Sequence, residues 1–171
     1  MLLAVDVAYR GTRGTAAGVL FERWESAAAT RELVVTIDGV AEYEPGQFYR
    51  RELPCIQTLL RHLAQPVEAI VIDGYVALGA EGAPGLGRHL WDALGGTTPV
   101  IGVAKTEFRG TPEAARLYRG GSTRPLFVTA IGLAPDEAKR HIAAMHGAHR
   151  LPDLLKAADR LCRGEAAMVR P

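Results

Sequence analysis

The chain has 171 residues, of which 48% are hydrophobic and 23% charged, an ordinary composition for a single globular domain spanning residues 1–171. No apolar run reaches the roughly 18–20 residues needed to cross a bilayer, and a start with an acid at position 6 does not resemble a signal peptide. We therefore expect a cytoplasmic monomer with no membrane partner. A net charge of +1 does not by itself indicate nucleic acid.

Charge is unevenly distributed along the chain. Residues 1–100 contain 8 Lys/Arg and 12 Asp/Glu, whereas residues 101–171 contain 12 and 7. Such a basic region is typical of a surface that contacts phosphates, although a solvated basic face has the same pattern. The residues concerned are Lys105, Arg109, Arg116, Arg119 and Arg124.

Apolar patterning predicts strands first and alternating elements later. Strands are expected at 2–9, 15–24 and 32–37, and their short connections indicate an antiparallel meander. The later elements are, in order, a helix from residue 53, a buried strand at 69–73, a glycine-rich loop at 74–85, a helix at 84–94, strands at 99–104 and 125–131, and helices that begin at Pro135 and Pro152.

This order predicts an α/β fold with a mixed central sheet, in which the meander is followed by parallel β/α units and helices flank both faces. Cys55 and Cys162 match no metal-binding spacing and lie on apolar helical faces. We therefore expect them to be buried thiols in a reducing compartment.

Three acids occupy unusual positions in this pattern. Asp6 lies inside the first apolar strand, Asp73 ends the strand at 69–73, and Glu52 begins the helix between them. A carboxylate in an apolar strand is costly unless it is paired, hydrogen-bonded or bound to metal. Ligands of open α/β sheets gather at the carboxyl ends of strands, where the three acids can converge. Otherwise each is a helix cap or an ion-pair partner.

Converging carboxylates repel one another unless a cation neutralises them, and oxygen ligands suit Mg²⁺ or Mn²⁺. A divalent ion held in this way lowers the pKa of bound water and polarises a phosphodiester. Lys105, just past a buried strand, is a candidate to neutralise charge that develops on a phosphate.

The segment around Glu52 carries the most specific motif. Residues 43–54 read Tyr-Glu-Pro-Gly-Gln-Phe-Tyr-Arg-Arg-Glu-Leu-Pro and resemble the Tyr-x-Pro-Gly-x-Leu-x-Phe-Arg-Glu-x-Pro segment of the endonuclease V family. Other motifs of that family are matched along most of the chain. They are residues 5–9, residues 72–74, residues 85–86 with 89–90, residues 99–105 (Pro-Val-Ile-Gly-Val-Ala-Lys), residues 149–153 and residues 157–159.

The resemblance implies a ribonuclease H-like fold and a divalent-metal-dependent endonuclease of the DNA-repair type. Members recognise hypoxanthine, the base of inosine, in DNA or RNA, and cut at the second phosphodiester on its 3′ side. By position, Asp6, Glu52 and Asp73 would be catalytic and bind Mg²⁺ or Mn²⁺, with Lys105 assisting at the phosphate. Residues implied at the substrate are Tyr43, Pro45, Gly46, Phe48 and Gly74. Tyr43 would belong to a wedge that replaces a flipped-out base, unless it is an ordinary core aromatic.

The chain departs from the family pattern in two places that concern the site. Leu133 stands where the family has the His of a Gly-His-Arg motif, a His that acts at the metal centre. Asp136 is a candidate to supply a carboxylate instead, whereas His141 is expected to be structural. After Asp73, the family's Gly-x-Gly-x-x-His-Pro-Arg is replaced by Gly-Tyr-Val-Ala-Leu-Gly-Ala-Glu.

Four functions stay open. The first is an active endonuclease V-type enzyme, favoured by the four intact site residues. The second is a diverged relative with another nucleic-acid substrate, favoured by the altered loop after Asp73. The third is a non-catalytic nucleic-acid-binding protein, favoured by the absent His. The fourth is a small-molecule site on a shared fold.

Overall fold

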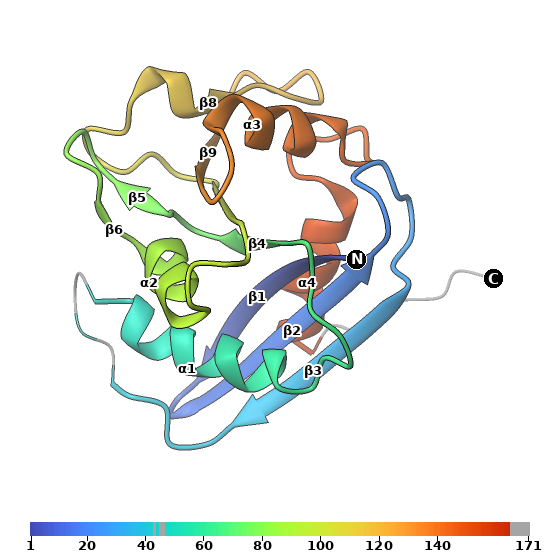
Figure 1. The fold of residues 1–171 in the computed structure, drawn as a ribbon, viewed down its shortest axis with the longest axis vertical. Coiled ribbons are helices and arrows are strands. Elements are labelled where there is room, and N and C mark those ends of the chain that lie inside the picture. Colours follow the sequence, from blue (N-terminus) through green and yellow to red (C-terminus); the bar gives the residue numbers. More distant parts are fainter. Residues whose placement is uncertain (43, 45–46, 165–171) are drawn as a thin grey trace.

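The computed structural model describes residues 1–42, 44 and 47–164 (Figure 1). Tyr43, Pro45 and Gly46, three of the residues expected at the substrate, lie outside the described residues. In the part of the chain that is described, no helix is both long and apolar enough to traverse a membrane.

A seven-stranded mixed sheet forms the centre of the fold, with strand order β3-β2-β1-β4-β7-β9-β8. The first three strands form the expected antiparallel meander, β1, β4 and β7 run parallel, and β9 is antiparallel to both β7 and β8. The predicted mixed sheet is therefore confirmed. The strands are β1 (Leu2–Arg10), β2 (Arg13–Phe21), β3 (Arg31–Ile37), β4 (Ala69–Asp73), β7 (Val100–Ala104), β8 (Arg116–Leu117) and β9 (Leu126–Ile131).

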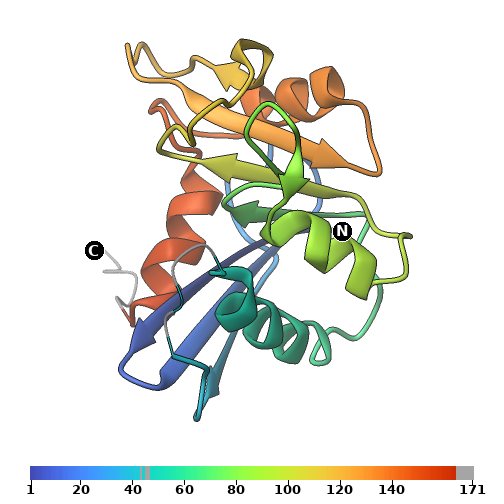
Figure 2. The ribbon, with the colours of Figure 1, turned by 90° about the vertical axis from the view of Figure 1, so that its left-hand side faces the viewer.

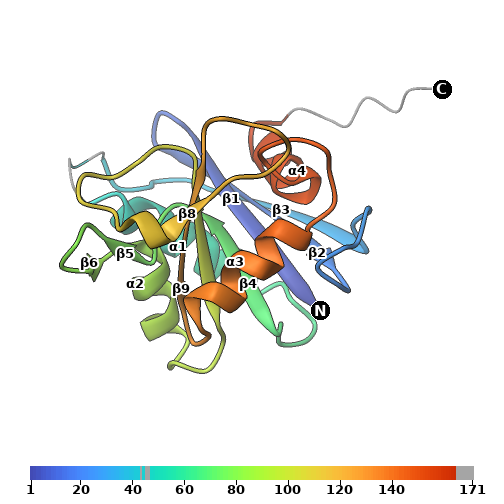
Figure 3. The ribbon, with the colours of Figure 1, turned by 90° about the horizontal axis from the view of Figure 1, so that it is seen from above.

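Helices cover both faces of this sheet (Figures 2 and 3). Helices α1 (Tyr49–Leu60) and α2 (Leu86–Ala93) pack on one face, and α3 (Pro135–Ala144) and α4 (Asp153–Cys162) pack on the other. Successive side chains of a strand point to opposite faces, so β1 contributes to both cores. Leu3 and Val5 pack with α1 and α2, whereas Leu2 and Ala4 pack with α3 and α4. Both cysteines are buried, as predicted.

The structure differs from the sequence prediction in three regions of the chain. The expected loop at 74–85 contains a short hairpin of β5 (Ala77–Leu78) and β6 (Ala83–Pro84), and a 3₁₀ turn, η1 (Glu113–Ala115), precedes the unpredicted β8. Helix α1 begins at Tyr49, ahead of the predicted start at residue 53. Pro54 lies inside it, beyond the first turn, so the helix lacks the N–H group that would bond the Arg50 carbonyl. This earlier start places Glu52 in the first turn.

Arg119 ties the segment around β8 to the connection between α3 and α4. Its guanidinium donates from Nη1 to the carbonyl of His149, and from Nη2 to those of Met145 and Gly147. The sequence placed Arg119 in a phosphate-contacting patch. That interpretation is wrong for this residue, because its donors are used inside the protein.

Arg119→Ala is expected to lower the free energy of unfolding by about 2–4 kcal/mol, because the variant leaves several carbonyls without a charged donor. Urea denaturation measures this change. Arg124→Ala, which removes an exposed arginine of the same segment, is the matched control and should stay within about 0.5 kcal/mol of the parent. Equal losses in the two variants would contradict the structural role of Arg119.

Candidate active site

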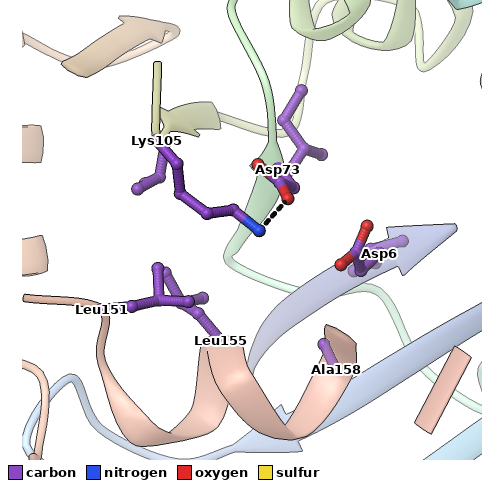
Figure 4. A pocket seen from close by; sticks show the side chains of 9 residues that line it. Asp6, Asp73, Lys105, Leu151, Leu155 and Ala158 are labelled. Atoms are coloured by element: carbon purple, nitrogen blue, oxygen red, sulfur yellow. Dashed lines mark ion pairs between the residues drawn. The ribbon is translucent and has the colours of Figure 1, made fainter. Parts of the chain in front are cut away.

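Four side chains from four elements meet at the carboxyl end of the parallel strands. Asp6 lies on β1, Asp73 ends β4, Lys105 follows β7, and Glu52 lies in the first turn of α1. The three acids line one cavity together. Asp6, Asp73 and Lys105 also line an adjoining pocket whose other wall belongs to α4 (Figure 4). The convergence expected from the sequence is therefore present.

The side chain of Lys105 extends toward Asp73 (Figure 4). The ion pair joins Lys105 Nζ to Asp73 Oδ2 at 2.6 Å, with both side chains 34% exposed. Burial opposes the charge of Lys105, but the hydrogen bond to Asp73 and the negative charges of Asp73, Asp6 and Asp159 together outweigh it and raise the pKa of the lysine. Lys105 is therefore a fixed positive charge beside the carboxylates.

Asp6 and Glu52 carry carboxyl groups that ionise with difficulty. Burial raises the pKa of Asp6 to about 7, and the charge of Asp73 adds to the rise, although the Val7 N–H that donates to Asp6 Oδ1 at 2.8 Å lowers it. Burial likewise raises the pKa of Glu52 to about 8, with further contributions from Asp6 and Asp73. Converging carboxylates of this kind repel one another when ionised, and a cation bound between them would relieve that repulsion.

The donor set fits a hard divalent ion by its chemistry, since carboxylate oxygens are the ligands that Mg²⁺ and Mn²⁺ prefer. The three carboxylates are not arranged in this structure to coordinate a single ion. Within residues 1–42, 44 and 47–164, no three His, Cys, Asp or Glu side chains are grouped closely enough to hold one as they stand. In this structure Oδ2 of Asp73 is paired with Lys105.

Asp159 is a further acid at this centre that sequence reasoning missed. It lies on α4, one helical turn after Leu155, which lines the same pocket as Asp6. Its negative charge raises the pKa values of both Asp6 and Lys105. The feature of the sequence that points to Asp159 is the family-like Ala-Asp pair at residues 158–159.

Leu133 lies at the wrong end of the sheet to replace a catalytic group. Strand β9 runs antiparallel to β7, pairing Ile131 with Val100 and Phe127 with Ala104. Residue 133 therefore lies beside the start of β7, whereas Lys105 follows its end, about 16 Å further along the strand. The side chain of Leu133 packs against the core beneath α3 and α4. The expectation that a His missing here deprives the metal centre of a group is wrong for this chain.

Asp136 does not serve as a substitute carboxylate either. Its side chain is 83% exposed and pairs with Lys139 at 3.4 Å. His141, expected to be structural, stacks on Trp24 with ring centroids 4.4 Å apart, far from any role at the acids. The prediction that Asp136 supplies a replacement carboxylate is therefore wrong.

An apolar pocket opens directly beside the acids. Glu52 and Asp73 line it, together with Phe48 and Gly74, the two described residues that the sequence placed at the substrate. Gly74 has φ of +138°, a conformation that other residues rarely adopt. The pocket volume of about 360 Å³ is within the range of about 300–1,000 Å³ of small-ligand sites. The remaining lining residues are Tyr49, Tyr75, Leu78, Pro84, Gly85, Leu86 and Phe108.

Tyr75 joins the loops that follow β4 and β7. Its hydroxyl donates to the Thr106 carbonyl at 2.8 Å and accepts from the Phe108 N–H at 3.0 Å. Phe108 is thereby fixed at the pocket mouth, although 45% of it is exposed. The loop after β4 also crosses closely over Gly102, where an added Cβ would lie 2.6 Å from the Gly74 carbonyl oxygen. The hydrogen bonds of Tyr75 and the close packing over Gly102 therefore fix the positions of both loops.

The predicted basic patch is largely neutralised. Arg116 pairs with Glu107 at 3.2 Å and with Glu113 at 3.0 Å. Lys105 pairs with Asp73, and the donors of Arg119 are used by carbonyls. Most of this segment therefore stabilises the fold and does not form a free phosphate-binding surface.

Comparison with known proteins identifies relatives of this chain. The sequence model of the endonuclease V family matches residues 1–140. An endonuclease V of Streptomyces avermitilis is 33% identical over an alignment of 186 residues, and the alignment covers 93% of this chain and 77% of the relative. An endonuclease V of Thermococcus kodakarensis is 29% identical over 164 residues, covering 96% of this chain and 78% of that protein.

Solved structures agree with these sequence matches. The crystal structure of the Streptomyces avermitilis endonuclease V has a TM-score of 0.73 and 30% identity, covering 95% of this chain and 79% of the other. Ciona intestinalis endonuclease V, solved with a 24mer DNA containing an inosine followed by a ribo-adenosine, has the same fold, with a TM-score of 0.79 at 19% identity over 99% of this chain and 87% of the other. The chain belongs to the endonuclease V family of nucleases.

Proposed function

We propose that this protein is a divalent-metal-dependent endonuclease that cuts a phosphodiester near a deaminated base, hypoxanthine, in DNA or RNA. The observation that carries the proposal is the shared wall between the apolar pocket and the acidic centre, formed by Glu52 and Asp73. A base held in the pocket lies beside the acids, so the strand to which it is attached passes over them.

Each residue has a part in the proposed reaction. Asp6, Glu52 and Asp73 would hold Mg²⁺ or Mn²⁺, which would supply an activated water and a polarised phosphate when bound. Lys105 would stabilise the negative charge that grows on the phosphate oxygens as the bond is attacked. Asp159 would keep Lys105 protonated and add negative charge on the α4 side.

The apolar pocket would select the base by shape and stacking. Phe48 and Phe108 offer exposed aromatic surface, and Tyr49 is held by a stack on His89 with ring centroids 3.7 Å apart. Aromatic side chains bind unstacked bases through their faces, which is how a flipped nucleotide is commonly held. The family's His and basic residues are missing from the loop at 74–81, so the pocket relies on aromatic and backbone groups.

Incubating the protein with matched inosine-containing and adenosine-containing strands, as DNA and as RNA, plus Mg²⁺ or Mn²⁺, tests the proposal. Cleavage of inosine strands that EDTA abolishes is expected. A folded protein that leaves every inosine strand intact would refute it. Cleavage of flap, mismatch, uracil or abasic substrates instead would show a diverged specificity, which the altered loop after Asp73 would explain.

Tyr75→Phe is expected to raise KM for the inosine substrate about 5- to 10-fold, with kcat changed less. Loss of the hydroxyl leaves the Thr106 carbonyl and the Phe108 N–H without their partner, which loosens Phe108 at the pocket mouth. Steady-state kinetics on a short fluorescent strand measures both constants. Tyr118→Phe, on an exposed tyrosine outside the pocket, is the matched control. An unchanged KM in Tyr75→Phe would contradict this account of the pocket.

A further inference from the structure

A second, polar groove lies on the other side of the acidic centre from the apolar pocket. It has a volume of about 530 Å³ and is formed where the end of β1 meets the end of α4. The sheet order places it beside β1 and β2, whereas the apolar pocket is built on the loops that follow β4 and β7. Its lining includes Ala8, Arg10, Thr15 and Arg163.

The groove continues the face of β1 that carries Asp6. Alternate residues of a strand share a face, so Asp6, Ala8 and Arg10 follow one another on the side covered by α4. Ala8 pairs with Thr15 of β2. Both side chains are small, which leaves open space between Asp6 and Arg10 on this face. Arg10 lies about 13 Å from Asp6 along the strand. A chain that passes over Asp6 in this direction meets Arg10.

Arg10 carries a charge that the described residues do not neutralise. Its Nη2 donates to the carbonyl of Arg163 at 3.1 Å, and within residues 1–42, 44 and 47–164 it forms no ion pair with a carboxylate. Arg13 lies directly opposite Arg10 across the β1–β2 hairpin but is paired with Asp38 at 2.8 Å. Arg163 uses Nε and Nη2 for Asp159, which leaves Nη1 outside that ion pair.

We propose that this groove is a phosphate-binding subsite for the nucleic-acid flank that lies beyond the cut, with Arg10 as its main contact. The inference rests on the proposed function, which places the base in the apolar pocket and the scissile phosphate over the acids. With cleavage on the 3′ side of the altered base, the strand that reaches Arg10 is the 3′ flank. Arg163 and the Thr15 hydroxyl supply further donors, whereas Asp159 confines the phosphate to the Arg10 end.

Truncation of the substrate separates this subsite from the rest of the molecule. The parent protein, Arg10→Ala, Arg10→Lys and Arg61→Ala are compared on inosine strands shortened stepwise from the 3′ end or from the 5′ end. Arg61, exposed at the end of α1, lies on the opposite face of the sheet from α4 and is the matched control. With a long 3′ flank, Arg10→Ala should raise KM about tenfold and Arg10→Lys much less.

Shortening the 3′ flank should erase the difference between Arg10→Ala and the parent, whereas shortening the 5′ flank should leave it unchanged. Binding of the uncut strand in EDTA, followed by fluorescence anisotropy, should show a salt slope smaller by about 0.7 in Arg10→Ala. A KM difference that persists without a 3′ flank, or one matched by Arg61→Ala, would overturn the subsite.

Failure of the proposed function gives a different pattern. If the parent protein cuts no inosine strand, the proposed function fails, and the anisotropy measurement alone then decides whether Arg10 contacts phosphate. An unchanged salt slope in Arg10→Ala would overturn the subsite in that case too. A reduced slope would retain it as a nucleic-acid contact.

Discussion

Asp6→Asn is expected to lower the cleavage rate by at least about 1,000-fold, because the loss of one carboxylate removes several kcal/mol of stabilisation at a metal-assisted phosphodiester. Asn keeps the shape of the side chain while removing its charge, so the folded structure should be retained. Asp6 lines the acidic cavity together with Glu52 and Asp73, and the charges of Lys105 and Asp159 act on it.

Asp136→Asn is the matched control for this experiment. Asp136 was the acid that the sequence offered as a replacement ligand, but its side chain is exposed and pairs with Lys139. Single-turnover cleavage of an inosine strand should be the same in Asp136→Asn as in the parent. Substantial cleavage by Asp6→Asn, or an equal loss in Asp136→Asn, would contradict the placement of the catalytic centre.

The second large effect concerns pH. Protons and a divalent ion compete for the same carboxylates, and the metal-free centre holds its protons up to pKa values of about 7 for Asp6 and about 8 for Glu52. The apparent Kd for Mn²⁺ should therefore fall by about 100-fold or more between pH 6 and pH 8, with protons released on binding. Isothermal titration calorimetry in buffers of different ionisation enthalpy measures both quantities. A Kd that is flat over this range would contradict the raised pKa values.

The same pKa shifts set the sign of the effect on stability. A carboxyl whose pKa is higher in the folded protein than in the unfolded chain binds its proton more tightly when folded. Its stabilising contribution is complete below about pH 4 and is lost as the pH rises through about 7 for Asp6 and about 8 for Glu52. Asp6→Asn should therefore raise the Tm of the metal-free protein relative to the parent at pH 8 but not at pH 5. Saturating Mn²⁺ should remove this advantage.

The fold could be predicted from local patterns because its strands and helices are strongly periodic. The apolar runs at 69–73 and 99–104 correspond to β4 and β7 with little change in their bounds. The acids could be predicted because a carboxylate in an apolar strand is conspicuous. The motif at residues 43–54 identifies Glu52, although the apolar spacing alone predicts too late a start for α1.

Other features depended on three-dimensional register, which a single sequence does not supply. The position of Leu133 relative to the acids follows from the antiparallel pairing of β9 with β7. The proximity of Asp159 to Asp6 follows from the packing of α4 over β1, and the role of Arg119 follows from carbonyls 26–30 residues away in the chain. Charge counting alone therefore overestimated the basic surface near residues 105–124.

The most direct test of the central claim is the anomalous signal of manganese in a crystal of this protein soaked in Mn²⁺. We expect an ion among the carboxylates of Asp6, Glu52 and Asp73, and its loss in crystals of Asp6→Asn. A well-ordered crystal with no manganese at these acids, or with manganese bound only at another site, would contradict it.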